Sequence, residues 1–281
     1  MTTQFSDLIF LHDQWFPAAQ AAVPIDDRGL RFGDGVFETM RIENASIYQM
    51  EFHLARLFEG LQAFSIPEID VTEILLQTIK KNNLCRGFLR LQISRGDGGD
   101  GYAPAKNSQP RIWARCFPMT EIEISPLNIW HSRWRSILPS QLPTAAKTLQ
   151  AGNAILARIE AIQNNCGEAL RTTISGNLSE CSAGSLLWQK SGKLYTPSLE
   201  NGALKGSIRH ALLQRFPREI NVGDYKLADL ESADAVCILN VRILARAVLS
   251  LAPENFTWPE SEKLAAHLRD FLLQDIAEQC V

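Results

Sequence analysis

Strand-like stretches follow one another in runs along this chain, and this arrangement constrains the fold more than any other feature of the sequence. Apolar and polar residues alternate with the period of two that is typical of strands at residues 35–41, 88–94 and 111–117. Further strand-like stretches lie at residues 8–11, 46–50, 168–174, 185–189, 235–239 and 247–251. Strands and helices do not alternate strictly, so the pattern predicts an α+β protein rather than a doubly wound parallel sheet.

Helical spacing of apolar residues separates these runs. It predicts helices at residues 51–64, at 71–83 with Thr72 as the N-cap, near 148–164, at 207–216 and at 261–278. Four prolines between residues 116 and 144 indicate a domain boundary. We therefore expect a small N-terminal domain over residues 1–118, a linker over 119–124 and a larger C-terminal domain over 125–281.

Composition and charge exclude several classes of protein. The chain has 28 basic and 31 acidic residues with no long block of like charge, so nucleic acid is not an expected partner. Its apolar runs are too short to span a membrane and its N-terminus does not resemble a signal peptide, which predicts a cytoplasmic protein. The six cysteines form no C-x-x-C pair, so we expect neither a disulfide framework nor a metal site.

Three glycine-bearing segments combine backbone freedom with functional side chains: residues 31–35, 95–102 and 204–209. The third leads into a helical pattern, which would place the N–H groups of Ser207 and Ile208 at a helix N-terminus, where anions bind favourably. An ordinary capped helix explains the same residues. The segment from Arg95 has neither P-loop nor dinucleotide-binding spacing, and a glycine-rich hairpin is its plain alternative.

Lys147 follows the uncharged pentapeptide at residues 142–146 (LPTAA) and has no charged neighbour in the sequence. A lysine in apolar surroundings has a lowered pKa and can act as a nucleophile toward a carbonyl carbon. A surface lysine at the start of a helix is the alternative. The five histidines lack the spacing of a zinc hydrolase and no G-x-S-x-G motif is present, so neither zinc nor serine hydrolysis is supported.

Five segments, taken in order, resemble the class IV pyridoxal-phosphate (PLP) aminotransferase family, which contains D-amino acid and branched-chain aminotransferases and the 4-amino-4-deoxychorismate lyases. The segments are residues 27–39 (DRGLRFGDGVFET), 53–57 (HLARL), 147–149 (KTL), 178–180 (LSE) and 206–209 (GSIR). The resemblance implies the two-domain fold of the D-amino acid aminotransferases, with a small N-terminal α/β domain and a larger, barrel-like C-terminal α/β domain. It also implies PLP as the cofactor and a homodimer acting on a small-molecule substrate.

The resemblance also implies roles for particular residues. Lys147 would bond covalently to the cofactor and transfer protons, and Glu180 would pair with the protonated pyridine nitrogen. Arg56 would bind the cofactor phosphate together with four further residues: Ser207, Ile208, Asn240 and Val241. This division is chemically reasonable, because the ring nitrogen needs a carboxylate whereas the phosphate needs a fixed cation and N–H donors.

Residues 93–102 (ISRGDGGDGY) resemble a glycine-rich stretch of the lyases. The implied reaction converts 4-amino-4-deoxychorismate to 4-aminobenzoate and pyruvate, a step of folate synthesis. Arg28, Arg90 and Arg95 could bind the substrate carboxylates, since arginine offers a bidentate fork, and Glu38 is also assigned to the substrate site. The alternatives are a class IV aminotransferase acting on D-amino acids or branched-chain amino acids with a 2-oxo acid, and a non-catalytic binding protein that keeps the fold.

Overall fold

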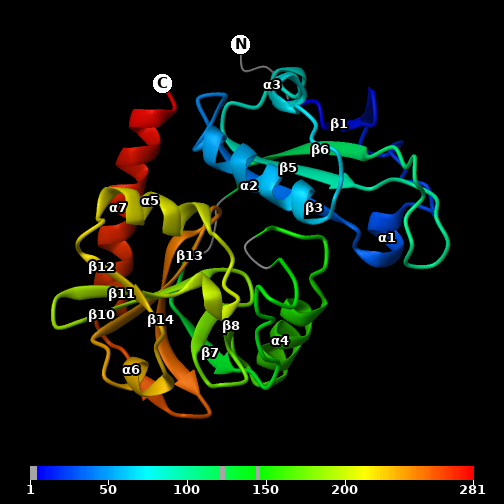
Figure 1. Ribbon diagram of the computed structural model, residues 1–281. Helices are drawn as coiled ribbons and strands as arrows, with labels where there is room; N and C mark the ends of the chain where they lie inside the picture. Colours follow the sequence, from blue (N-terminus) through cyan, green and yellow to red (C-terminus); the bar gives the residue numbers. More distant parts are fainter. Residues whose placement is uncertain (1–4, 121–123, 144–145) are drawn as a thin grey trace. The chain divides into compact units, whose positions relative to one another are not determined.

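The computed structural model describes residues 5–120, 124–143 and 146–281, and its internal contacts divide the chain into two compact units (Figure 1). Unit 1 comprises Met1–Glu121, Ala146–Gln150 and Ile276–Val281, and unit 2 comprises Ile122–Ala145 and Ala151–Asp275. This division differs from the expected domains, because the short segment containing Lys147 and the C-terminal residues are part of unit 1. The expected linker, 119–124, includes residues 121–123, which lie outside the described part of the chain.

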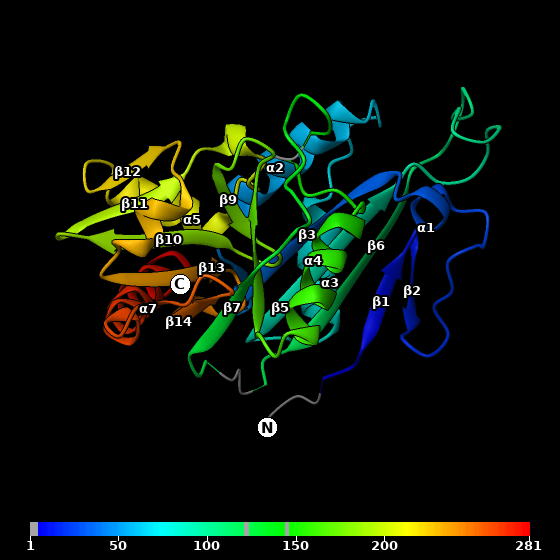
Figure 2. The ribbon, with the colours of Figure 1, turned by 90° about the horizontal axis from the view of Figure 1, so that it is seen from below.

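Unit 1 is built on a six-stranded antiparallel sheet with the order β2-β1-β6-β5-β3-β4, and Figure 2 shows β2 and β1 at one edge of it. Its strands are β1 (Leu8–Leu11), β2 (Gln14–Pro17), β3 (Gly35–Glu43), β4 (Ser46–Ile47), β5 (Gly87–Ser94) and β6 (Arg111–Pro118). The predicted alternating stretches in this part of the chain are therefore confirmed as strands, whereas β2 was not anticipated.

Two helices, α2 (Met50–Ala63) and α3 (Thr72–Lys81), pack on one face of this sheet and share its apolar core. Because side chains alternate along a strand, Val36, Glu38 and Met40 of β3 point to the helix-covered face, whereas Phe37 points to the other. The predicted N-cap of α3, Thr72, is wrong by one residue, because the N-cap is Val71. Thr72 is the first helical residue, and its N–H donates to Asp70 Oδ1 at 2.9 Å.

Helix α2 comes unusually close to β3 at Gly60. A Cβ atom at this position would lie 2.9 Å from Val36 Cγ1 and 3.3 Å from Ala146 Cβ, so a larger residue would push the helix away. The close approach also brings the buried side chains of His53 and Arg56, which lie one to two turns before Gly60 in α2, against β3. Glycine is therefore required here for packing and not for its backbone freedom.

Unit 2 is built on a mixed nine-stranded sheet with the order β12-β11-β10-β13-β14-β7-β8-β9, in which β15 also pairs with β14. The pairs β11–β12, β14–β7 and β7–β8 are parallel and the others are antiparallel. Its strands are β7 (Leu127–His131), β8 (Glu168–Thr172), β9 (Leu178–Cys181), β10 (Ser185–Lys190), β11 (Lys193–Pro197), β12 (Ile220–Gly223), β13 (Ala235–Asn240), β14 (Leu244–Ala252) and β15 (Phe256–Thr257).

The sheet of unit 2 curls, because β9 at its end also contacts β10 and β11. A core that includes Ile129, Trp188 and Leu251 fills the inside of this curl. The helical elements of unit 2 are α4 (Gly152–Gln163), the 3₁₀ turn η1 (Leu199–Asn201), α5 (Ser207–Arg215), α6 (Leu227–Glu231) and α7 (Ser261–Gln279). The last residues of α7, from Ile276 onward, belong to unit 1. Helix α1 (Arg28–Phe32) also belongs to unit 1. In the part of the chain that the structure describes, no helix is long and apolar enough to cross a membrane.

The helix predicted near 148–164 begins later than expected. Residues 147–149 instead run alongside β3: Phe37 N–H donates to Lys147 O at 2.8 Å, and Leu149 N–H donates to Gly35 O at 2.9 Å. Helix α4 then starts at Gly152. Lys147 is therefore held by backbone pairing with a strand, and the alternative of a lysine that opens a surface helix is wrong.

Candidate active site

A buried cluster of charged side chains joins β3 to α2 in unit 1. The Glu38 carboxylate accepts hydrogen bonds from Arg56 Nε at 2.7 Å and Arg56 Nη2 at 2.5 Å, one on each oxygen. His53 Nδ1 lies 2.7 Å from Glu38 Oε2 and therefore carries the proton that it shares with this carboxylate. Glu38 and His53 are fully buried and Arg56 is 3% exposed. Two contacts to one carboxylate fix the Arg56 guanidinium rigidly in place.

The pKa of Glu38 reflects this cluster. Burial alone would raise it, but the positive charge of Arg56, the interaction with His53 and the hydrogen bonds from both residues lower the pKa of Glu38 to about 2. Glu38 is therefore an anion over the whole physiological pH range, and its charge is committed to Arg56 and His53. We predicted Glu38 for the substrate site; its burial and its contacts favour a role in holding Arg56.

The side chain of Lys147 lies against an aromatic ring. Its ammonium nitrogen is 4.3 Å from the centroid of Phe37, which lies on the face of the β3 sheet opposite to Glu38. The backbone of the same lysine accepts the Phe37 N–H. Both contacts join Lys147 to β3, so the strand sets the position of this amine.

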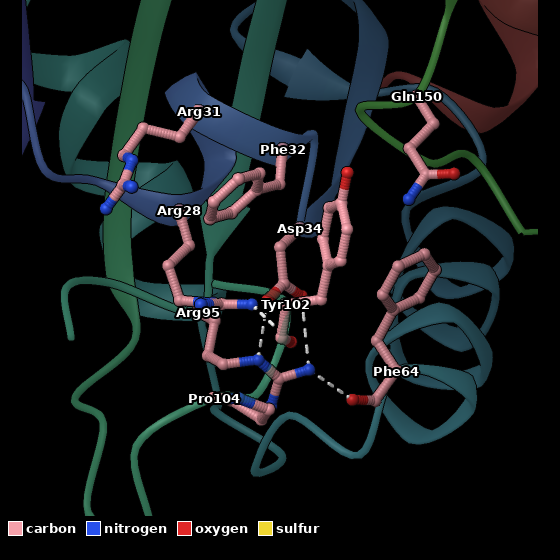
Figure 3. Close-up of a pocket in the computed structure, with 9 residues that line it drawn as sticks. All are labelled: Arg28, Arg31, Phe32, Asp34, Phe64, Arg95, Tyr102, Pro104 and Gln150. Carbon is pink, nitrogen blue, oxygen red and sulfur yellow. Dashed lines mark hydrogen bonds and ion pairs between the residues drawn. The ribbon is translucent and has the colours of Figure 1, made fainter. Parts of the chain in front are cut away.

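A cavity of about 460 Å³ in unit 1 is lined by arginines and aromatic rings (Figure 3). Arg28 Nε and Arg95 Nε both donate to Asp34 Oδ2 at 2.8 Å, and the two guanidiniums lower the pKa of Asp34 even though burial alone would raise it. Arg31 also lines the cavity, and its side chain points away from Asp34 in Figure 3. Three arginines against one carboxylate give the cavity a net positive charge.

Arg28 and Arg95 hold the loop between β5 and β6. Arg28 donates to the carbonyl oxygens of Gly98, Gly101 and Tyr102 at 3.3, 3.0 and 2.9 Å, and Arg95 Nη2 donates to Phe64 O at 2.5 Å. This loop is the predicted glycine-rich hairpin connection, and Gly96, Gly98, Gly99 and Gly101 all adopt positive φ in it. Most of the donors of these two predicted substrate arginines are therefore used within the protein. Arg90 is exposed and lies over the Phe117 ring, on the sheet face opposite to Glu38.

In unit 2, Glu180 lies near the end of β9 and is fixed at both carboxylate oxygens. Arg171 Nη2 donates to Oε1 at 2.7 Å, and the backbone N–H of Leu204 donates to Oε2 at 2.9 Å. Arg171 Nη1 also donates to Asn153 Oδ1 at 2.5 Å. The carboxylate thus has a single orientation, which suits a residue that must meet a ring nitrogen.

Two backbone turns of unit 2 contain the remaining predicted residues. Ser207 and Ile208 form the first turn of α5, whose leading N–H groups have no partner within the helix. Asn240 ends β13 and Val241 begins the turn to β14, in which the N–H groups of Arg242 and Ile243 each donate to Asn240 Oδ1 at 3.0 Å. The first turn is confirmed as a helix N-terminus, and the Asn240 side chain organises the second.

Comparison with known proteins identifies the family. The family model described as amino-transferase class IV matches residues 35–251, more than three quarters of the chain. The chain belongs to the class IV aminotransferase family. Enzymes of this family use PLP, so the chain is a PLP-dependent enzyme.

Individual class IV relatives have different activities at similar identity. A Methanocaldococcus jannaschii protein provisionally assigned as a branched-chain-amino-acid aminotransferase is 29% identical and covers 82% of this chain and 83% of the relative. The aminodeoxychorismate lyase of Vibrio harveyi is 26% identical over 84% of this chain and 90% of the relative. The family is therefore established, whereas these identities do not separate lyase from aminotransferase.

Solved structures confirm the predicted class IV fold, with a small antiparallel-sheet domain and a larger, curled mixed half-barrel domain. The branched-chain aminotransferase of Escherichia coli superposes with a TM-score of 0.87 at 22% identity, covering 96% of this chain and 94% of that chain. The 4-amino-4-deoxychorismate lyase of Pseudomonas aeruginosa has a TM-score of 0.82 at 28% identity, covering 95% of this chain and 99% of that chain.

The residues present fit the chemistry of PLP. Lys147 would provide an amine for the aldehyde, Glu180 a fixed carboxylate for the pyridine nitrogen, and Arg56 a buried cation for the phosphate. The N-terminus of α5 adds N–H donors of the kind that bind phosphate. Among the described residues, no cluster of His, Cys, Asp and Glu could hold a metal ion.

Sequence reasoning assigned no role to four ionisable residues of these clusters: Arg31, Asp34, His53 and Arg171. His53 and Arg56 are three residues apart, which places both side chains on one face of a helix. This spacing could have indicated that they share a partner. Asp34 stands within a glycine-bearing segment that we singled out, but nothing there indicates two arginine partners. Arg171 has no sequence feature that marks it.

Proposed function

We propose that this enzyme is an aminodeoxychorismate lyase that converts 4-amino-4-deoxychorismate to 4-aminobenzoate and pyruvate in folate synthesis. The loop of residues 95–102 carries this proposal, because its sequence resembles the lyases and it borders an arginine-lined cavity suited to a substrate with carboxylate groups. The similarity to the lyases of Vibrio harveyi and Pseudomonas aeruginosa supports it further.

In this proposal the residues predicted for the cofactor have separate roles. Bound PLP supplies an electron-accepting ring that stabilises negative charge on the substrate. Lys147 would hold the cofactor through its aldehyde carbon and, once the substrate amine has displaced it from that carbon, would remove and return protons at the substrate. Glu180 keeps the proton on the pyridine nitrogen. Arg56 binds the phosphate together with Ser207, Ile208, Asn240 and Val241.

The substrate-binding roles change once the contacts are considered. Arg28 and Arg95 position the 95–102 loop through Asp34 and backbone carbonyls, and they raise the positive potential of the cavity. Arg31 forms a 3.9 Å ion pair with Asp26, and both side chains are exposed, so Arg31 is better placed to turn toward a substrate carboxylate. Arg90 would act from the other face of the sheet, where Phe37 and Lys147 lie.

A product assay tests the proposal directly. We expect the purified holoenzyme to release 4-aminobenzoate and pyruvate from 4-amino-4-deoxychorismate without any 2-oxo acid. We also expect no transfer of an amino group from D-alanine or leucine to 2-oxoglutarate. Amino transfer without 4-aminobenzoate would refute the lyase proposal and establish a class IV aminotransferase, the second candidate, which the 29% identical relative favours. Absence of both reactions would refute both candidates.

We further propose that the enzyme is a homodimer formed through α4. Ile155, Leu156, Ile159 and Ile162 form an exposed apolar stripe on this helix. Such a stripe is costly in water and can pack against its own copy across a twofold axis, because a twofold interface is self-complementary.

Light scattering should show the wild-type protein at twice the chain mass of 31.4 kDa, and the Ile159→Glu variant at the single-chain mass. A buried charge without a partner disfavours the dimer strongly. As a control, Ile174→Glu adds the same charge at an isoleucine that is 87% exposed outside the helix, and it should leave the dimer intact. A dimeric Ile159→Glu variant would rule out this interface.

A further inference from the structure

We infer that Arg171 is a positioning residue that holds Glu180 as an oriented anion toward the cofactor ring, an inference that rests on the role of Glu180 proposed above. Arg171 belongs to β8 and Glu180 to the neighbouring antiparallel strand β9. Their guanidinium and carboxylate are 2.7 Å apart, and both side chains are largely buried, at 8% and 12% exposure.

An irregularity in the strand pairing brings these two side chains together. Leu170 pairs with Cys181 and Thr172 with Leu178, so Arg171 alone stands opposite two residues of β9, Ser179 and Glu180. Such a β-bulge re-aims a side chain that regular alternation would direct elsewhere. The local backbone is thus shaped to place the Glu180 carboxylate beside the Arg171 guanidinium.

The hydrogen bonds of Arg171 indicate that its guanidinium is placed to bind Glu180 and is not placed to satisfy all of its own donors. Nη2 donates to Glu180 and Nη1 to Asn153, which fixes the guanidinium from two sides. Its buried Nε has no hydrogen-bond partner among the described residues. A buried donor without a partner lowers stability, so this arrangement is not the one that packing alone would favour.

The charge of Arg171 has a definite consequence for the ring nitrogen. A carboxylate that faces a pyridine nitrogen can leave the shared proton on the nitrogen or take it. Arg171 contacts the Glu180 carboxylate directly, so its positive charge acts more strongly on this carboxylate than on a ring nitrogen that Glu180 binds. The charge therefore favours the anionic form of Glu180. The proton then stays on the nitrogen, where it strengthens the ring as an electron acceptor.

Other groups around Glu180 are charged or titratable. Arg209 of α5 is buried and donates to Pro197 O, and its burial lowers its pKa while the charge of Glu180 raises it. Cys181 follows Glu180 in β9, and burial, together with the charges of Glu168 and Glu180, raises its pKa well above the usual value. The thiol is therefore neutral at any pH of interest, and the direct hydrogen bond from Arg171 Nη2 makes its charge a strong influence on Glu180.

The test follows the visible absorbance of the holoenzyme as pH is varied without substrate, which reports on protons held by the cofactor and by Lys147. In Arg171→Leu the ring nitrogen holds its proton less firmly. Without that positive charge on the ring, the nitrogen that joins Lys147 to the cofactor keeps its own proton to higher pH, so the midpoint of the visible titration should rise by about one pH unit. Arg171→Lys keeps the charge and should restore most of the wild-type midpoint, as a purely steric role would not. Arg158→Leu is the matched control, because Arg158 of α4 forms an ion pair at 3.0 Å with Glu168, which lies on β8, the strand that carries Arg171.

The outcomes separate this inference from the proposed role of Glu180. If Glu180→Gln shifts the midpoint and Arg171→Leu does not, the inference is wrong while the proposed role stands. If neither variant shifts it, both fail. If both shift it and the double variant shifts it no further than Glu180→Gln alone, Arg171 acts through Glu180. Should Arg171→Leu fail to fold, a midpoint in Arg171→Lys as high as that of Glu180→Gln would overturn the inference and a near-normal midpoint would support it.

Discussion

Replacing Lys147 by alanine should abolish turnover, by on the order of 10⁴-fold or more, because the amine both holds the cofactor covalently and transfers protons at the substrate. Phe37 already fixes this lysine, through its backbone N–H and its ring. The substitution leaves the backbone pairing with β3 in place, so we expect an enzyme that folds but is colourless after dialysis. Mass spectrometry after borohydride reduction should find a pyridoxyl group on Lys147 of the wild type and on no residue of the variant.

The control for this experiment is Lys193→Ala. Lys193 begins β11 and is exposed, and no described contact ties it to the residues proposed for the cofactor. This variant should keep its colour, its label on Lys147 and its activity. A label on another lysine of the wild type would contradict the assignment of Lys147 and, with it, the proposed roles of the residues around the cofactor.

Strong periodicity made the central strands predictable, and its absence explains the strands that were missed. β6 alternates between half-buried and buried residues over its first six positions, as the sequence indicated, and β3 and β5 alternate only in their middle positions. β9 and β12 have only four residues each, too few for a period of two to stand out. The late start of α4 was hidden for a different reason: residues 147–149 are held by hydrogen bonds to β3, a contact over more than a hundred positions that local propensity does not encode.

The candidate site likewise contains residues that could be predicted from the sequence and partners of those residues that could not. Lys147, Glu180 and the first turn of α5 could be proposed because each lies in a short motif that resembles the family. The partners of these residues could not, because Glu38 with Arg56 and Arg171 with Glu180 meet only when strands and helices have packed. The β-bulge that aims Glu180 is likewise a property of two paired strands, and neither strand shows it in isolation.

The Glu38→Gln variant should lose stability strongly at neutral pH, by about 3–5 kcal/mol, because it leaves the buried Arg56 without its counter-charge. In a chain of this size such a loss lowers the melting temperature by on the order of 10 °C. Urea unfolding at pH 7 measures the difference. The exposed Asp70, whose pKa is lowered by a hydrogen bond from the backbone N–H of Thr72, gives the matched control Asp70→Asn, for which little change is expected.

The pH dependence of this difference is the more specific test. The pKa of Glu38 is about 2 in the folded protein, against an ordinary value of 4.5, so between these values the unfolded chain binds more protons than the folded one. The contribution of Glu38 to stability is therefore complete above pH 4.5 and is lost as the pH falls toward 2. The gap between wild type and Glu38→Gln should shrink by roughly half or more between pH 7 and pH 3. A gap that stays constant would mean that the variant is destabilised by altered packing and that the charge of Glu38 does not hold Arg56 in place.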